Sequence, residues 1–140
     1  MKYFKGMLIL IFIFNIAGCG KKVWPEPDAS LEKFSISITH QQMQADCLKI
    51  QAEISGNHRN LATIVLELEI SEEPCPTCPF IVSTPILMDP GSPEAVLLEN
   101  QLTIVHCGLD PDKYYRARLR AGNVHRVIRD VMSGVVIIEQ

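Results

Sequence analysis

The sequence has few aromatic residues: phenylalanine, tyrosine and a single tryptophan together make up 6% of its 140 residues. It also lacks the G-x-S-x-G, H-E-x-x-H, P-loop and G-x-G-x-x-G motifs, and its four histidines have no carboxylate or serine at the spacing of a catalytic triad. Positive charge is not in excess, because the formal net charge is −3. These absences predict a protein that is not an enzyme, needs no cofactor or metal, has no small-molecule substrate and does not bind nucleic acid.

The first eighteen residues have the layout of a secretory leader. Lys2 and Lys5 are followed by eight consecutive apolar residues, 7–14, and then by a run that ends in small residues. The apolar run is too short to cross a bilayer, which takes on the order of 20 apolar residues. Residues 1–18 are therefore predicted to be a signal peptide, with an uncleaved anchor as the alternative.

Cys19 ends the motif Ile16-Ala17-Gly18-Cys19, which resembles the lipobox of bacterial lipoproteins. The resemblance implies cleavage before Cys19 and two or three acyl chains, such as palmitate, on that residue. So many chains attach a protein to the membrane in an effectively permanent way. Gly20 stands where an aspartate favours the inner membrane in this family, so the resemblance implies the outer membrane, facing the periplasm.

Residues 19–32 are predicted to be the lipidated N-terminus and an extended tether. Residues 20–30 contain two prolines and show no helical or strand period. At about 3.1 Å per residue, such a tether holds a domain roughly 30 Å from the bilayer. The stretch 19–27 also resembles the start of the small lipoproteins that assist lipopolysaccharide-transport assembly, through Cys19, Gly20, Lys22 and Pro27. That resemblance implies an accessory role in this assembly.

Residues 33–140 alternate apolar and polar positions without long helical periods, which predicts a single all-β domain. Turn sequences such as Ser55-Gly56-Asn57 and Asp89-Pro90-Gly91 separate seven candidate strands, at spacings typical of an antiparallel sandwich. The strands are expected around 34–38, 48–54, 64–70, Ile81, 102–104, 115–121 and 131–138.

The stretch 109–123, LDPDKYYRARLRAGN, resembles the sixth-strand signature of fibronectin type III domains. The resemblance implies an immunoglobulin-like sandwich of seven strands. It also implies that Tyr115 forms a tyrosine corner, with a buried ring and a hydroxyl bonded to the backbone near Leu109. An ordinary buried tyrosine is the alternative. The tryptophan of this family's second strand is absent, so we expect the core to be filled differently.

Four cysteines follow Cys19, and an even number in an exported protein favours disulfides. Three pairings are possible. In the topology that the resemblance implies, Cys47 opens the second strand and Cys107 ends the fifth, which is its antiparallel neighbour. The preferred bridge is therefore Cys47 to Cys107, and closing a loop of roughly 60 residues stabilises a fold by roughly 4 kcal/mol.

Cys75 and Cys78 form the remaining pair, in a C-x-x-C motif that also occurs in dithiol oxidoreductases. Three prolines stiffen this stretch, 73–79, and a reactive pair needs a helix N-terminus instead. A structural disulfide is the preferred interpretation. A redox-active dithiol and a metal site completed by His106 or His125 are the alternatives.

Alternation on the sixth predicted strand directs three arginines away from the core. Glu67 and Glu69 lie on the polar side of the third strand, which pairs with the sixth in this fold. One interpretation is cross-strand ion pairs worth roughly 0.2–1 kcal/mol each. The other is a surface for an anionic partner, made of Arg116, Arg118, Arg120, Arg126 and Arg129.

These features predict a membrane-anchored lipoprotein that acts as a protein-binding or scaffolding module in the bacterial cell envelope. Its partners are expected to be the membrane and another envelope protein. The rival prediction is a periplasmic thiol–disulfide protein that uses Cys75 and Cys78.

Overall fold

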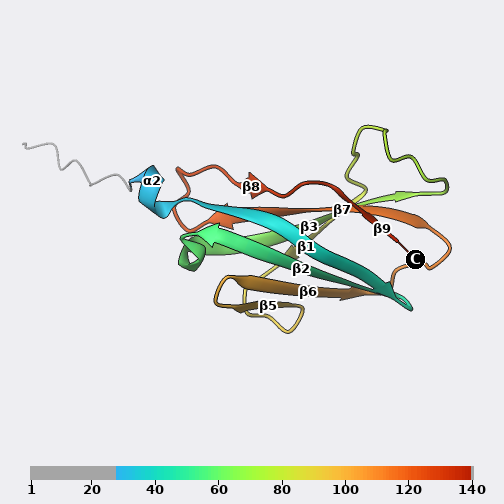
Figure 1. Cartoon of the computed structure of the whole chain (residues 1–140), viewed down its shortest axis with the longest axis horizontal. Coiled ribbons are helices and arrows are strands. Elements are labelled where there is room, and N and C mark those ends of the chain that lie inside the picture. The colour runs from blue at the N-terminus through green and yellow to red at the C-terminus, as the bar shows by residue number, and fades with distance from the viewer. Residues whose placement is uncertain (1–27, 140) are drawn as a thin grey trace, which may run out of the picture.

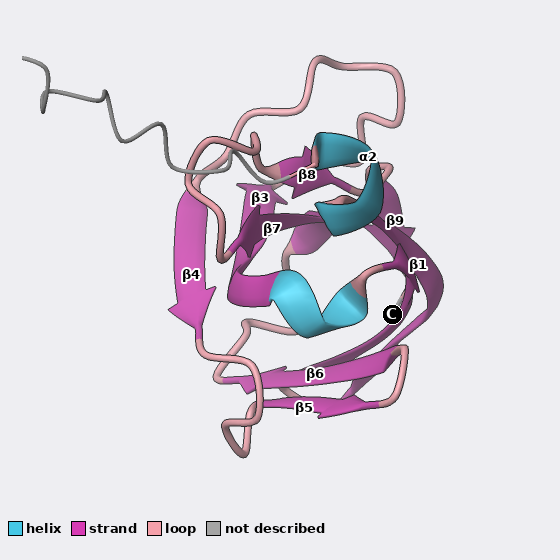
Figure 2. Ribbon diagram, turned by 90° about the vertical axis from the view of Figure 1, so that its left-hand side faces the viewer, coloured by secondary structure: helices cyan, strands magenta, loops and turns pink. Residues whose placement is uncertain are grey.

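The computed structural model describes residues 28–139, so the predicted leader, Cys19 and the first part of the predicted tether lie outside the described residues. The described chain forms two antiparallel sheets that face each other (Figures 1 and 2), as the sequence predicts. The first sheet has the order β1 (Phe34–Gln44), β2 (Cys47–Gly56), β6 (Gln101–Cys107) and β5 (Ala95–Leu98). The second has the order β4 (Thr84–Met88), β3 (Leu61–Ser71), β7 (Tyr114–Asn123) and β8 (Val131–Met132), with β9 (Val136–Ile138) also on β7.

The predicted all-β, immunoglobulin-like sandwich is confirmed, but three strand positions differ from the expected ones. The fourth strand is β4, which begins at Thr84, whereas Ile81 lies in the preceding loop. Pro85 is tolerated in β4 because that strand forms the edge of its sheet. β5 is an additional short strand, and the last predicted strand is divided into β8 and β9.

The division between β8 and β9 occurs at Ser133, a buried residue. Its hydroxyl accepts a hydrogen bond from the backbone N–H of Leu119 at 2.9 Å, and its own N–H donates to the Leu119 carbonyl at 2.9 Å. A side-chain oxygen thus takes the place of a ladder carbonyl, and the strand is interrupted there.

The core lies between the two sheets and contains no tryptophan among the described residues. Aliphatic side chains that alternate along the strands fill it, and Tyr115 is its buried tyrosine. The largest fully buried side chains are those of Leu48, Ile50, Ile54, Ile64, Leu66, Leu68, Leu102, Ile104 and Leu119.

The last residues of the predicted tether do not stay extended, because residues 29–32 form the single-turn helix α2 (Ala29–Glu32). Asp28 caps this turn: its carboxylate accepts the backbone N–H of Ser30 at 2.9 Å. Hydrogen bonds from the Ser30 hydroxyl and backbone lower the pKa of the Asp28 carboxyl. The short 3-10 helix η1 (His58–Asn60) lies beside α2. No helix within residues 28–139 is long and apolar enough to cross a membrane.

Gly56 ends β2 where the chain passes close to the start of β1. Its φ angle is +97°, and a Cβ atom there would lie 2.7 Å from the carbonyl oxygen of Lys33. Only glycine avoids both the backbone strain and the clash, so the turn into η1 depends on it.

Candidate functional site

The outer side of the β3–β7 pair carries a ladder of opposite charges. Glu67 lies opposite Arg118 and Glu69 lies opposite Arg116 in the antiparallel register. The guanidinium of Arg116 is 2.6 Å from the Glu69 carboxylate, and that of Arg118 is 2.5 Å from Glu67. Of the two sequence interpretations, these distances support cross-strand ion pairs.

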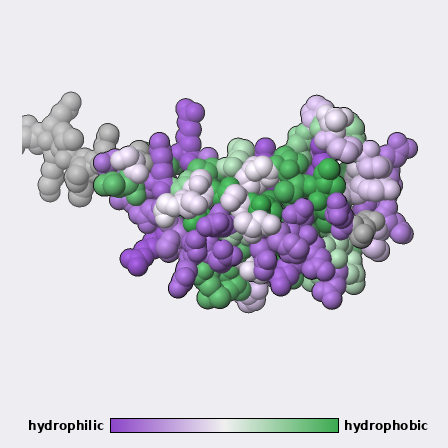
Figure 3. Space-filling view, in the orientation of Figure 1, coloured by the Kyte–Doolittle hydropathy of each residue, from purple (hydrophilic) through white to green (hydrophobic). Residues whose placement is uncertain are grey.

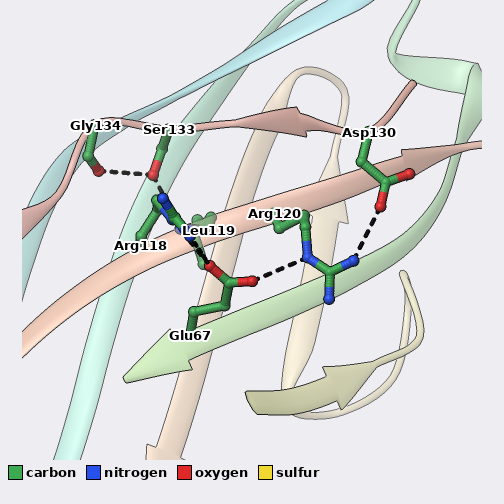
Figure 4. A network of polar contacts seen from close by, with 7 residues as sticks. All are labelled: Glu67, Arg118, Leu119, Arg120, Asp130, Ser133 and Gly134. Carbon is green, nitrogen blue, oxygen red and sulfur yellow. Dashed lines mark hydrogen bonds and ion pairs between the residues drawn. The ribbon is translucent and has the colours of Figure 1, made fainter. Parts of the chain in front are cut away.

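Glu67 is the centre of this network, as Figure 4 shows. One carboxylate oxygen accepts two hydrogen bonds from Arg118, and the other accepts one from Arg120 at 3.0 Å. Arg120 continues the chain of contacts to Asp130, at 3.1 Å. Burial raises the pKa of the Glu67 carboxyl, but the hydrogen bonds from the two arginines outweigh it, so the pKa lies below its ordinary value.

The loop between β3 and β4, residues 72–83, folds back over this ladder. The Phe80 ring lies 5.0 Å from the guanidinium carbon of Arg118 and 5.9 Å from that of Arg116. Arg116 also donates hydrogen bonds to the carbonyl oxygens of Cys78, at 2.8 Å, and of Pro79, at 3.0 Å. The side chain of Arg116 is therefore only 12% exposed.

The five arginines of the predicted partner surface do not share the same surroundings. Arg116, Arg118 and Arg120 bind carboxylates of the same domain, and the loop covers the first two. Arg126 and Arg129 are exposed on the loop between β7 and β8, which lies at the other end of β7. Arg120 connects the two groups, because it also pairs with Asp130, the residue directly after Arg129.

A groove of about 330 Å³ lies between the 72–83 loop, the start of β7 and the end of β9. Its rim carries large apolar side chains that are unusually exposed: Ile81 is 68% exposed and Ile137 49%, and Tyr114 stands beside them. The Arg116–Glu69 pair supplies charged side chains to the lining. The groove is therefore an apolar site with a few polar groups, which is the usual character of a binding pocket.

Apolar surface continues beyond the groove on the side of β8 and β9. Met132, Val135 and Ile137 are all exposed there. Figure 3 shows apolar surface on this face, extending toward the end of the domain opposite α2. Such a group of exposed apolar side chains is a candidate site of interaction.

Cys75 and Cys78 form a disulfide that lines the groove. The pair lies in an irregular loop between two strands rather than at a helix N-terminus. The other disulfide joins Cys47 to Cys107, which are register partners on β2 and β6. Both pairings are the ones that the sequence predicts.

Tyr115 lies below the groove with its ring buried, at the start of β7. Its hydroxyl accepts a hydrogen bond from the backbone N–H of Asp110 at 2.9 Å. This is the geometry of a tyrosine corner at Tyr115, with a hydroxyl bonded to the backbone next to Leu109, as the sequence resemblance implies. It fixes the loop before β7 and so positions Tyr114 at the rim.

The groove itself is not evident in the sequence, because its lining comes from three separate segments. The one feature of the sequence that could have indicated the groove is a pair of apolar residues, Phe80 and Ile81, directly after a proline-rich stretch.

Among the described residues, the histidines and cysteines do not form a cluster of three metal-ligating side chains. His125 lies 3.7 Å from Glu32, beside α2, and so at the other end of the domain from Cys75 and Cys78. In residues 28–139 there is no group of three or more histidine, cysteine, aspartate or glutamate residues that could hold a metal ion.

A comparison with known protein families finds no family model that matches the chain, and a comparison with curated proteins finds no match either.

Proposed function

We propose that this protein is a lipid-anchored binding module of the bacterial cell envelope. In this proposal Cys19 holds the chain in the outer membrane, facing the periplasm. The groove between the 72–83 loop and β9 then binds an extended segment of another envelope protein.

The observation that carries the proposal is the position and character of the groove. The described chain begins at the α2 end of the sandwich, whereas the groove lies at the opposite end, where β3 ends and β7 begins. An N-terminal anchor would leave this end directed away from the membrane. A volume of about 330 Å³ is at the small end for ligand pockets, and suits one or two apolar side chains better than a large cofactor.

Mass spectrometry of the protein extracted from native membranes tests the anchor. The expected result is a chain that begins at Cys19 and carries the mass of two or three acyl chains. An unmodified Cys19, or an intact leader, would contradict this part of the proposal.

Site-specific photo-crosslinking tests the groove. A photoreactive residue placed at Ile81 or at Ile137 is expected to capture the same envelope protein. Val96, an exposed residue on the outside of the other sheet, is the matched control and should not capture it. Ile137→Asp should abolish capture from position 81. Capture from position 81 that persists in the Ile137→Asp variant would contradict a binding role for the groove. Equal capture from Val96 would contradict it as well.

The disulfide of Cys75 and Cys78 motivates the rival function, a periplasmic thiol–disulfide protein. Equilibration with glutathione buffers separates the two functions. A structural bridge stays oxidised in these buffers, whereas a working redox pair has a reduction potential of about −200 mV or above and becomes reduced. Reduction in that range would favour the rival.

A further inference from the structure

The loop between β7 and β8 forms a tight turn at the α2 end of the domain. The N–H of Ile128 donates to the carbonyl oxygen of His125 at 2.9 Å, which makes Arg126 and Val127 the two central residues of a β-turn. Ile128 is 7% exposed and fixes the turn to the domain, whereas Val127 is 77% exposed. The turn therefore presents one cationic and one aliphatic side chain to the outside.

The acids around this turn are already engaged within the domain. Asp130 pairs with Arg120, Glu32 accepts hydrogen bonds from asparagine amides, and Asp28 caps α2. Glu32 and Asp28 keep their own negative charge. Within the described part of the chain, however, no carboxylate lies within ion-pair distance of Arg126 or Arg129, so both guanidinium groups can bind an external anion.

Exposed aliphatic side chains accompany this charge. Val124 on the same loop is half-exposed, and Leu31 on α2 is largely exposed. Exposing the apolar side chain of Val127 to water at the tip of the turn is unfavourable. A combination of arginines and exposed aliphatic residues is typical of surfaces that lie in the headgroup region of an anionic membrane.

The turn also lies where the chain from Cys19 enters the domain. The side chain of Asn123, at the end of β7, donates to the carbonyl oxygen of Glu32 at 2.8 Å. Figure 1 shows α2 and this loop at the same end of the sandwich. Eight residues lie between Cys19 and Asp28, and a fully extended chain of nine Cα–Cα steps spans at most about 32 Å, which is the upper limit on the distance between the anchor and α2.

We propose that the turn at Arg126 and Val127 contacts the bilayer that holds the anchor. Arg126 and Arg129 bind anionic phosphodiester headgroups, and Val127 enters the boundary with the acyl chains. This inference rests on the proposed lipid anchor at Cys19. It adds an orientation: the α2 end faces the bilayer, and the groove faces away from it.

Fluorescence of the acylated full protein in vesicles tests this contact. Val127→Trp is the reporter and Val105→Trp, near the far end of β6, is the matched control, both in a Trp24→Phe background. In phosphatidylcholine vesicles that contain phosphatidylglycerol, brominated acyl chains should quench the first variant and not the second. Replacing Arg126 or Arg129 by alanine should weaken the contact roughly fivefold each, and high salt should weaken it further.

Two failures are distinguishable. If mass spectrometry shows no acyl chain on Cys19, the proposed anchor fails and this inference fails with it. If Cys19 is acylated but Val127→Trp is quenched no more than Val105→Trp, the anchor stands and the contact is disproved. Equal quenching in vesicles of phosphatidylcholine alone would disprove the role of the arginines.

Discussion

The two sheets of this sandwich differ in what covers their outer faces. In β2, inward residues are fully buried and outward residues such as Lys49 and Gln51 reach solvent, so burial alternates strictly. In β3, residues 64–68 are all buried, including Val65 and Glu67 on the outer face. On this sheet the side chains of Arg118 and Arg120 bond to Glu67. The 72–83 loop then contacts Arg116 and Arg118 from outside. Alternation alone therefore does not tell an open sheet from a covered one.

The largest expected effect concerns the open sheet and its bridge between β2 and β6. Replacing Cys47 and Cys107 by serine should lower the free energy of unfolding by about 4 kcal/mol, because the bridge closes a loop of 60 residues. Removal of the Cys75–Cys78 bridge, which closes a very short loop, should cost about half as much on the same account. Denaturant unfolding of both variants measures the comparison. Equal losses would show that the covering loop stabilises the fold as much as the sheet bridge does.

The second prediction concerns Glu67 in the covered sheet. Glu67→Gln should destabilise the domain by about 2 kcal/mol, since Arg118 and Arg120 would lose their shared carboxylate in a partly buried site. Glu53→Gln is the control on the open face of β2, where a carboxylate bonds only the side chain of Asn100. It should change stability by less than about 0.5 kcal/mol. Similar values for the two variants would remove the difference between the sheets.

Stability at acidic pH gives a third test of the same residue. The pKa of Glu67 is lower in the folded protein than its ordinary value of 4.5, so the unfolded chain binds a proton more readily. The contribution of the Glu67 carboxylate to the free energy of unfolding should be complete above pH 4.5. It should fall as the pH drops below that value toward the lowered pKa of the folded protein. Unfolding curves of the parent and of Glu67→Gln should therefore converge as the pH falls. Parallel curves would contradict the lowered pKa.

The smallest effect on stability is expected from a change in the 72–83 loop. Phe80→Ala removes the ring above Arg116 and Arg118 and should cost about 1 kcal/mol. The charge ladder should remain, because its ion pairs belong to β3 and β7. Salt-dependent unfolding measures the change, since newly exposed pairs are screened more strongly. An unchanged salt dependence would show that the loop does not shield the ladder.

Much of the fold follows from local patterns in the sequence. Alternation identifies β1, β2, β3, β6 and β7. The topology implied by the fibronectin resemblance then places Cys47 beside Cys107 and the acids of β3 beside the arginines of β7, whereas the register that pairs Glu67 with Arg118 comes from the structure. Tyr115 follows from a short motif with a fixed spacing. In each case, a few residues and one known strand geometry suffice.

The candidate site is harder to predict because its contacts join distant segments. Phe80 and Ile81 lie in a stretch without any period, and nothing local indicates that the loop folds back onto β7. The sequence does not indicate β5, since four residues are too few to establish an alternation. The five arginines look like one cluster in sequence, yet the 72–83 loop covers Arg116 and Arg118, whereas Arg126 and Arg129 are exposed beyond the end of β7.

The asparagine clamp around α2 has a mechanical consequence. Side-chain amides of Asn57, Asn60 and Asn123 hold the carbonyl oxygens of Leu31 and Glu32, directly before β1. A pull on the N-terminus is passed through this clamp and along β1, whose hydrogen bonds to β2 run from Phe34 to Gln44. Force in that direction loads this ladder in shear, on both sides of the register shift between Ile38 and His40. A domain held at one end by a membrane and at the other by a partner would carry tension along this ladder.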